Sequence, residues 1–128
     1  MSLVTVSKVR KAFGDNVVLH DVNLEVADGS VTVLIGPSGS GKTTLLRCLN
    51  GLEKPEAGTV TMNDVTIDFS QHHDREQFAA LRAQSGMVFQ AHHLFPHRTA
   101  LENVTEGPIY AQREPVDQAR ARGLELLE

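Results

Sequence analysis

Residues 31–50 read VTVLIGPSGSGKTTLLRCLN, and the expected fold can be worked out from them. Val31–Ile35 is apolar and rich in β-branched residues, which is typical of a strand covered on both faces. Residues 36–41 contain three glycines, two serines and a proline, so the strand is expected to end there. The apolar residues of segment 42–50 recur at helical spacing, and Gly51 suits the end of a helix. The order of strand, glycine-rich loop and helix predicts an α/β fold.

The glycine-rich loop matches the pattern G-x-x-x-x-G-K-[ST] of a phosphate-binding P-loop. The matching residues are Gly36, Pro37, Ser38, Gly39, Ser40, Gly41, Lys42 and Thr43, and Thr44 follows them. Glycines let backbone N–H groups approach phosphate oxygens, and the start of the helix adds positive partial charge. Lys42 is expected to reach the β and γ phosphates, and the Thr43 hydroxyl to ligate Mg²⁺. The pattern predicts a nucleotide site and leaves the reaction open.

Further strands are expected before and after this unit in the sequence. Leu3–Val9 and Val17–Val26 alternate apolar and polar residues, as half-buried strands do. The segment 59–67 has the pattern of a short hairpin that turns at Asn63-Asp64. Met87–Phe89 is expected to form one further short strand that ends before Gln90.

Three more helices are predicted from signals at their ends. The helix expected over 74–84 begins with an aspartate that is followed three residues later by a glutamine, which is capping-box spacing. Thr99 and Glu102 have the same spacing at the start of the next helix. Pro108 is expected to end or kink that helix, and Pro115 suits the first turn of a last one.

Composition narrows the class of protein. The chain has 128 residues, of which 41% are hydrophobic and 22% are charged, so one packed domain or part of one is expected. The net charge of −4 argues against a nucleic-acid partner. Cys48 is the single cysteine and is expected to fill the core. The six histidines show no metal-ligand spacing, so we expect no zinc site.

The sequences around the P-loop resemble the nucleotide-binding subunits of ABC transporters. The segments that carry the resemblance are VLHDVNL at 18–24, IGPSGSGKTTLLR at 35–47 and LNGLEKPEAG at 49–58. MVFQ at 87–90, with LFPH at 94–97 and TALENV at 99–104, is similar to the Q-loop region of the same family. The sequences of these segments are most similar to those of the subunits that serve importers of polar amino acids.

This resemblance implies roles for individual residues. Phe13 matches the aromatic residue that stacks on adenine, with an ordinary core aromatic as the alternative. Residues 36–44 match the phosphate cradle of an ATP site. Gln90 matches the glutamine that contacts Mg²⁺ or the attacking water, with an exposed strand-end glutamine as the alternative. Lys42 and Gln90 are therefore the expected catalytic residues, and Thr43 and Gln90 the expected metal ligands.

The resemblance also implies the architecture. It indicates a P-loop NTPase core of the ABC type, with an N-terminal antiparallel β region and part of a helical subdomain, apparently truncated. Residues 1–128 would be a partial ABC ATPase domain, with the β region and P-loop core at about 1–86 and the Q-loop and the start of the helical subdomain at about 87–128. After Leu46 no apolar strand ends in an Asp-Glu pair, and no Leu-Ser-Gly-Gly-Gln segment occurs. We therefore expect the chain to bind nucleotide without efficient hydrolysis.

The expected partners follow from the same resemblance. They are ATP, Mg²⁺, transmembrane permease subunits and a second nucleotide-binding subunit, at the cytoplasmic face of the inner membrane. Two other functions stay open. A P-loop kinase of small molecules would need an arginine-rich lid, which we do not find in the sequence. The second is a nucleotide-binding module without catalysis, in which this short chain would be the mature product.

Overall fold

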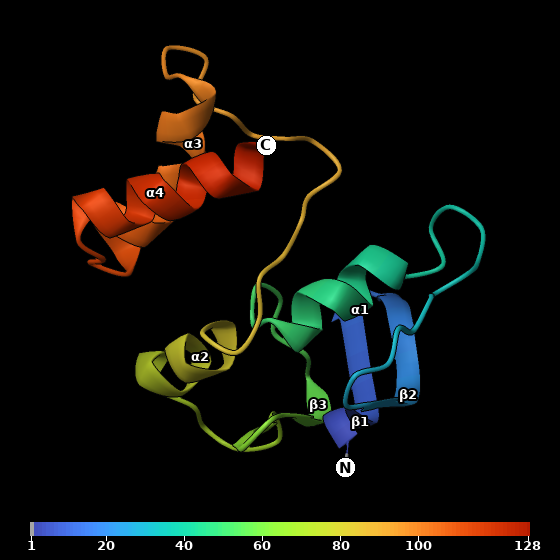
Figure 1. Cartoon of the computed structure of the whole chain (residues 1–128). Coiled ribbons are helices and arrows are strands. Elements are labelled where there is room, and N and C mark those ends of the chain that lie inside the picture. The colour runs from blue at the N-terminus through green and yellow to red at the C-terminus, as the bar shows by residue number, and fades with distance from the viewer. Residues whose placement is uncertain (1) are drawn as a thin grey trace. The chain divides into compact units, whose positions relative to one another are not determined.

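A four-stranded antiparallel sheet forms the first part of the chain (Figure 1). The computed structural model describes residues 2–128. The strands are β1 (Ser2–Phe13), β2 (Asn16–Ala27), β3 (Ala57–Met62) and β4 (Val65–Asp68), in the order β2-β1-β3-β4. The predicted strands at Leu3–Val9 and Val17–Val26, and the hairpin at 59–67, are confirmed.

The central strand β1 supplies much of the core. Val4 and Val6 are buried at the two-residue period of a strand, and an irregularity between Val6 and Val9, where Lys8 has a φ of +49°, lets Val9 be buried as well. One glycine lets β3 come close to β1. Gly58 has a φ of +97°, and a Cβ at this position would lie 2.5 Å from the carbonyl oxygen of Lys8. Only glycine therefore fits where the two backbones meet.

Two helices complete the first of the two compact units into which the chain divides, Met1–Met87 and Val88–Glu128. Helix α1 (Lys42–Leu49) buries Leu45 and Cys48 in the core beside the sheet. Helix α2 (Arg75–Arg82) begins at the predicted capping box and buries Leu81 completely. The glycine expected to end α1 lies against α2, because a Cβ at Gly51 would be 3.2 Å from the Phe78 ring.

Two predicted strands are wrong. Val31–Ile35 has no regular secondary structure, and its residues Val31 and Ile35 are 91% and 92% exposed. Met87–Phe89 is also irregular, and its middle residue Val88 is 98% exposed. A strand needs hydrogen bonds to a neighbour, and in the described part of the chain no strand pairs with either segment. Apolar β-branched composition alone therefore does not produce a strand at these two places.

The second unit is helical. It contains α3 (Ala100–Glu106), a π-helical turn η1 (Gly107–Ala111) and α4 (Val116–Leu127). The capping box at Thr99 and Glu102 is confirmed, and α3 ends just before Pro108, as predicted. The last helix begins at Val116, one residue later than expected, with Pro115 as its N-cap. Over residues 2–128 every helix falls short of the length and apolar character that a bilayer crossing requires.

Glycine also permits close helix packing in this second unit. A Cβ at Gly123 of α4 would lie 2.9 Å from Leu101 Cδ1 and 2.9 Å from Thr105 Cγ2 of α3. The neighbouring Ala119 is 1% exposed. The small residues Ala119 and Gly123 of α4 therefore let side chains of α3 pack closely against the backbone of α4.

Candidate functional site

The predicted P-loop leads directly into α1, as the sequence indicated. Gly39 and Gly41 have φ angles of +81° and +93°, which L residues with a Cβ rarely adopt. Gly41 is the N-cap of α1, and its carbonyl accepts the first helical hydrogen bond from Leu45 N at 2.8 Å. A Cβ on Gly41 would be 3.0 Å from both Val18 Cγ1 and Leu19 Cδ2 of β2. The helix therefore starts tightly against the sheet.

Lys42 lies across the loop that precedes it. Its ammonium donates to the carbonyl oxygens of Gly36 at 2.8 Å and Pro37 at 2.7 Å, and to Ser40 Oγ at 3.1 Å. Three oxygen acceptors around one cation resemble the environment that phosphate oxygens would provide. The loop is also tight, since a Cβ on Gly36 would lie 2.9 Å from Ser40 Oγ. The ammonium is thus held at the loop by neutral oxygens that a phosphate could replace.

A cavity of about 320 Å³ opens at this loop. It is lined by Val18, Ser38, Gly39, Gly41, Lys42, Thr43 and Thr44. The Thr43 side chain is exposed there, and a hydroxyl oxygen is a ligand that Mg²⁺ accepts. The glycines at its wall leave backbone N–H groups free of Cβ atoms. The residues present therefore fit a polyphosphate with its magnesium ion.

Phe13 ends β1 at the tip of the hairpin that also supplies Val18. The residue is 49% exposed, so the alternative of an ordinary core aromatic does not hold. Ala12 pairs with Val17, one residue before the cavity-lining Val18. The hairpin thus connects the exposed ring to the strand that forms part of the cavity wall.

Lys11 is a functional candidate that the sequence reasoning missed. It is 8% exposed, and its ammonium contacts Glu53 Oε1 and Glu56 Oε1, each at 3.2 Å. Desolvation lowers the pKa of Lys11, but hydrogen bonds to the two carboxylates outweigh it and raise the pKa above the usual 10.5. The sequence did offer one signal that Lys11 lies beside Phe13: residues two apart in a strand point to the same side of it.

Gln90 belongs to the second unit and is exposed. The expectation of a strand end at Gln90 is wrong, since the residues before it form no strand. Its predicted contact with Mg²⁺ or water stays a prediction.

Cys48 lies in the core behind the P-loop. Burial raises the pKa of its thiol to about 11 from 9.0. The thiol is fully buried and serves as core filler, as expected. Among residues 2–128 no group of three or more histidine, cysteine, aspartate or glutamate side chains is arranged to hold a metal ion.

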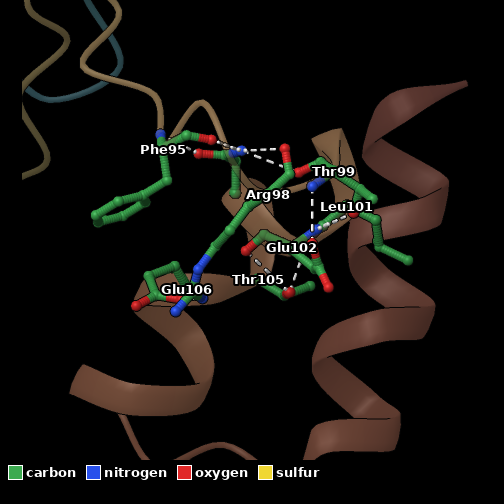
Figure 2. Close-up of polar contacts among 8 residues, drawn as sticks. Phe95, Arg98, Thr99, Leu101, Glu102, Thr105 and Glu106 are labelled. Atoms are coloured by element: carbon green, nitrogen blue, oxygen red, sulfur yellow. Dashed lines mark hydrogen bonds and ion pairs between the residues drawn. The ribbon is translucent and has the colours of Figure 1, made fainter.

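A network of polar contacts at the start of α3 orders the second unit (Figure 2). Asn103 accepts from Phe95 N at 2.8 Å and donates to the carbonyl oxygens of Phe95, Arg98 and Thr99. Arg98 forms an ion pair with Glu106, and both line a cavity of about 620 Å³. The lining includes the cations of Arg98 and Arg120 and the carboxylates of Glu102 and Glu106, so no one sign of charge dominates it.

Comparison with known proteins gives consistent matches over the chain. The family model described as ABC transporter matches residues 19–126. The L-cystine import ATP-binding protein TcyC of Bacillus subtilis is 48% identical over 98% of the chain and 51% of that protein. The L-cystine transport system ATP-binding protein TcyN of Escherichia coli is 50% identical over 99% of the chain and 52% of that protein. The chain spans about half the length of the curated relatives it matches.

A solved structure extends the comparison to the fold. The ATP-binding cassette MJ0796, described as a dimer in a post-hydrolysis state with ADP and Pi, superposes with a TM-score of 0.77. The identity is 33%, and the match covers 95% of the chain and 54% of that cassette. The predicted fold class, an ABC-type core with an antiparallel β region and part of a helical subdomain, is confirmed.

Proposed function

Because this chain belongs to the ABC transporter family, we propose that it provides one ATP-binding face of a subunit that couples ATP binding and hydrolysis to solute import. The observation that carries the proposal is the arrangement at the P-loop. Lys42, the left-handed glycines and the start of α1 surround one cavity. The alternative of a small-molecule kinase has no comparable support, since the matched relatives are transport proteins.

The loop residues would hold the phosphate chain. Backbone N–H groups of the cavity-lining residues 38, 39 and 41–44 would donate to phosphate oxygens at the positive end of α1. The Lys42 ammonium would exchange the carbonyls of Gly36 and Pro37 for the β and γ phosphates. This exchange replaces neutral acceptors by charged ones, so it favours the bound state.

The remaining site residues complete the proposal. Phe13 would stack on the adenine ring, for which its exposed face is suited. The Thr43 hydroxyl at the P-loop cavity would hold Mg²⁺, which neutralises phosphate charge when it is bound. Gln90 belongs to the other unit, and its proposed roles as a metal ligand and as the residue that orients the attacking water rest on the resemblance alone. Lys42 and Gln90 are thus the proposed catalytic residues.

The partners and the solute are proposed from relatives. MJ0796 is described as dimeric, so we propose that a second ATP-binding subunit faces this one. TcyC and TcyN are described as L-cystine import and transport proteins, which supports an amino acid as the solute. Such a subunit would act with transmembrane permease subunits at the cytoplasmic face of the membrane.

Equilibrium titration tests the proposal. The purified chain is titrated with ATP in the presence of Mg²⁺ by calorimetry, together with Lys42→Ala and the control Arg75→Ala, which removes an exposed cation of α2 outside the cavity. Charge-assisted hydrogen bonds contribute about 1.5–3 kcal/mol each, so Lys42→Ala should raise Kd at least about tenfold. The control should bind as the original chain does. Equal affinity of Lys42→Ala and the original chain would refute the assigned site.

A further inference from the structure

Lys11 places a buried cation at the end of β1. The residue is 8% exposed, and its ammonium donates to the Lys54 carbonyl oxygen at 2.9 Å and to Glu56 Oε1 at 3.2 Å. Glu53 Oε1 is also 3.2 Å away. Three oxygens from one short segment therefore fix the position of this cation.

The same ammonium lies over the ring of Phe13. The distance from Lys11 Nζ to the ring centroid is 4.8 Å, which is within the range of a cation–π interaction. A cation draws one face of an aromatic ring toward itself and restricts the ring's rotation. Phe13 nevertheless remains 49% exposed, so part of the residue stays open to a ligand.

This cluster also reaches the P-loop helix. Glu53 follows α1 closely, and its backbone N–H donates to the Arg47 carbonyl in the last turn of that helix at 3.1 Å. Glu56 is tied back to β1, because its Oε2 accepts from Ala12 N at 2.8 Å. The segment 53–56 therefore joins the end of α1 to the strand that ends with Phe13.

We propose that Lys11 is a positioning residue for the nucleotide base: held by Glu53 and Glu56, it fixes the Phe13 ring so that the open face receives the base. The proposal rests on the ATP site proposed above. A ring that is already ordered loses less conformational freedom when a base stacks on it. Lys11 therefore contributes to affinity through the base and leaves the phosphate contacts of the loop unchanged.

The test compares a ligand that has a base with one that lacks it. ATP and inorganic tripolyphosphate, each with Mg²⁺, are titrated into the purified chain and into Lys11→Met and Lys11→Arg. Ordering a side chain on binding costs about 0.5–1.5 kcal/mol, so Lys11→Met should weaken ATP binding about 2- to 12-fold. Binding of tripolyphosphate should stay within about twofold. Lys11→Arg keeps a cation beside the ring and should restore most of the ATP affinity.

The outcomes separate this inference from the proposed function. If the original chain binds neither ligand, the ATP site itself fails. If the original chain binds both and Lys11→Met weakens both equally or neither, the positioning role is overturned.

A second variant covers loss of folding. Lys11→Met leaves two carboxylates without their cation, so the triple variant K11M/E53Q/E56Q is measured beside it, with circular dichroism to verify folding. The triple variant should show the same selective loss for ATP. Lys11→Met is also measured in a Phe13→Leu background, where it should cause little further loss of ATP affinity because Lys11 acts through the Phe13 ring. A large further loss in that background would overturn the positioning role.

Discussion

Replacing Gly41 by alanine tests whether packing against β2 determines the form of the P-loop. The φ angle of Gly41 is +93°, and the added Cβ would lie 3.0 Å from Val18 Cγ1 and from Leu19 Cδ2, and 3.2 Å from the Val18 carbonyl oxygen. Gly39 is the matched control. Its φ angle is +81°, but a Cβ there would meet nothing within 4 Å.

Both substitutions incur the cost of a left-handed backbone, but only Gly41→Ala also incurs a cost from steric crowding. Left-handed backbone costs an alanine about 1–2 kcal/mol, and this applies at both positions. Crowding a packed site adds about 1–3 kcal/mol, and this applies only to Gly41→Ala. The gain from restricting the unfolded chain is the same for both variants, so it cancels in the comparison. The difference in free energy of unfolding should therefore be about 1–3 kcal/mol.

Urea denaturation followed by circular dichroism measures this difference. With a slope of about 1–2 kcal/mol/M for a chain of this size, the midpoint of Gly41→Ala should lie about 1 M below that of Gly39→Ala. Adding Val18→Ala to Gly41→Ala removes one of the close methyl contacts and should recover part of the loss.

Equal midpoints for the two alanine variants would refute the reasoning. So would a lower midpoint for Gly39→Ala, because its added methyl group enters open space. Failure of Val18→Ala to recover stability would show that the Val18 carbonyl or Leu19 sets the limit, and would leave the effect of Gly41→Ala itself unchanged.

Three other measurements follow from the structure. Because the pKa of Cys48 rises from 9.0 to about 11, its thiol should react with iodoacetamide at pH 8 at least about 100-fold more slowly in the folded chain than in urea; equal rates would contradict its burial. Hydrogen bonds from Thr99 hold the pKa of Glu102 below its usual 4.5. The stabilisation that the ionised carboxylate provides is therefore complete above pH 4.5 and is lost as the pH falls through the pKa of the folded state. In urea titrations, Glu102→Gln should flatten the loss of stability between about pH 5 and 3. Val33 is 71% exposed in an apolar segment, so Val33→Lys should reduce concentration-dependent self-association in sedimentation velocity, and an original chain that stays monomeric at every concentration would contradict this.

Local signals in the sequence predicted local structure well. The capping boxes at Asp74 and Thr99 involve groups three residues apart, and both form as expected. The turn at Asn63-Asp64 and the start of α1 at Lys42 are equally local. In each case the residues that make the contact are neighbours in the chain, so their spacing carries the information.

Contacts between residues far apart in the chain could not be predicted from the sequence. Lys11 meets Glu56 across 45 positions, and no pattern in the chain marks the two as partners. The spacing of Lys11 and Phe13 on one side of β1 could have indicated that the two side chains meet, but it could not have shown that the ammonium is buried. The hydrogen bond from the Lys42 ammonium to the Gly36 carbonyl oxygen also depends on the conformation of the loop, which the motif does not specify.

The candidate site forms although the predicted strand Val31–Ile35 before it does not. The composition of this segment favours a strand, yet a strand is stabilised by a neighbour, and within residues 2–128 it has none. The loop and α1 follow this irregular segment directly and still adopt the predicted form. The contacts that hold them are local, from Lys42 Nζ to Gly36 and Pro37 and from Leu45 N to Gly41, or reach only β2. The proposed phosphate cradle is therefore shaped by β2 and by the loop itself, and it forms although the preceding segment is not in a sheet.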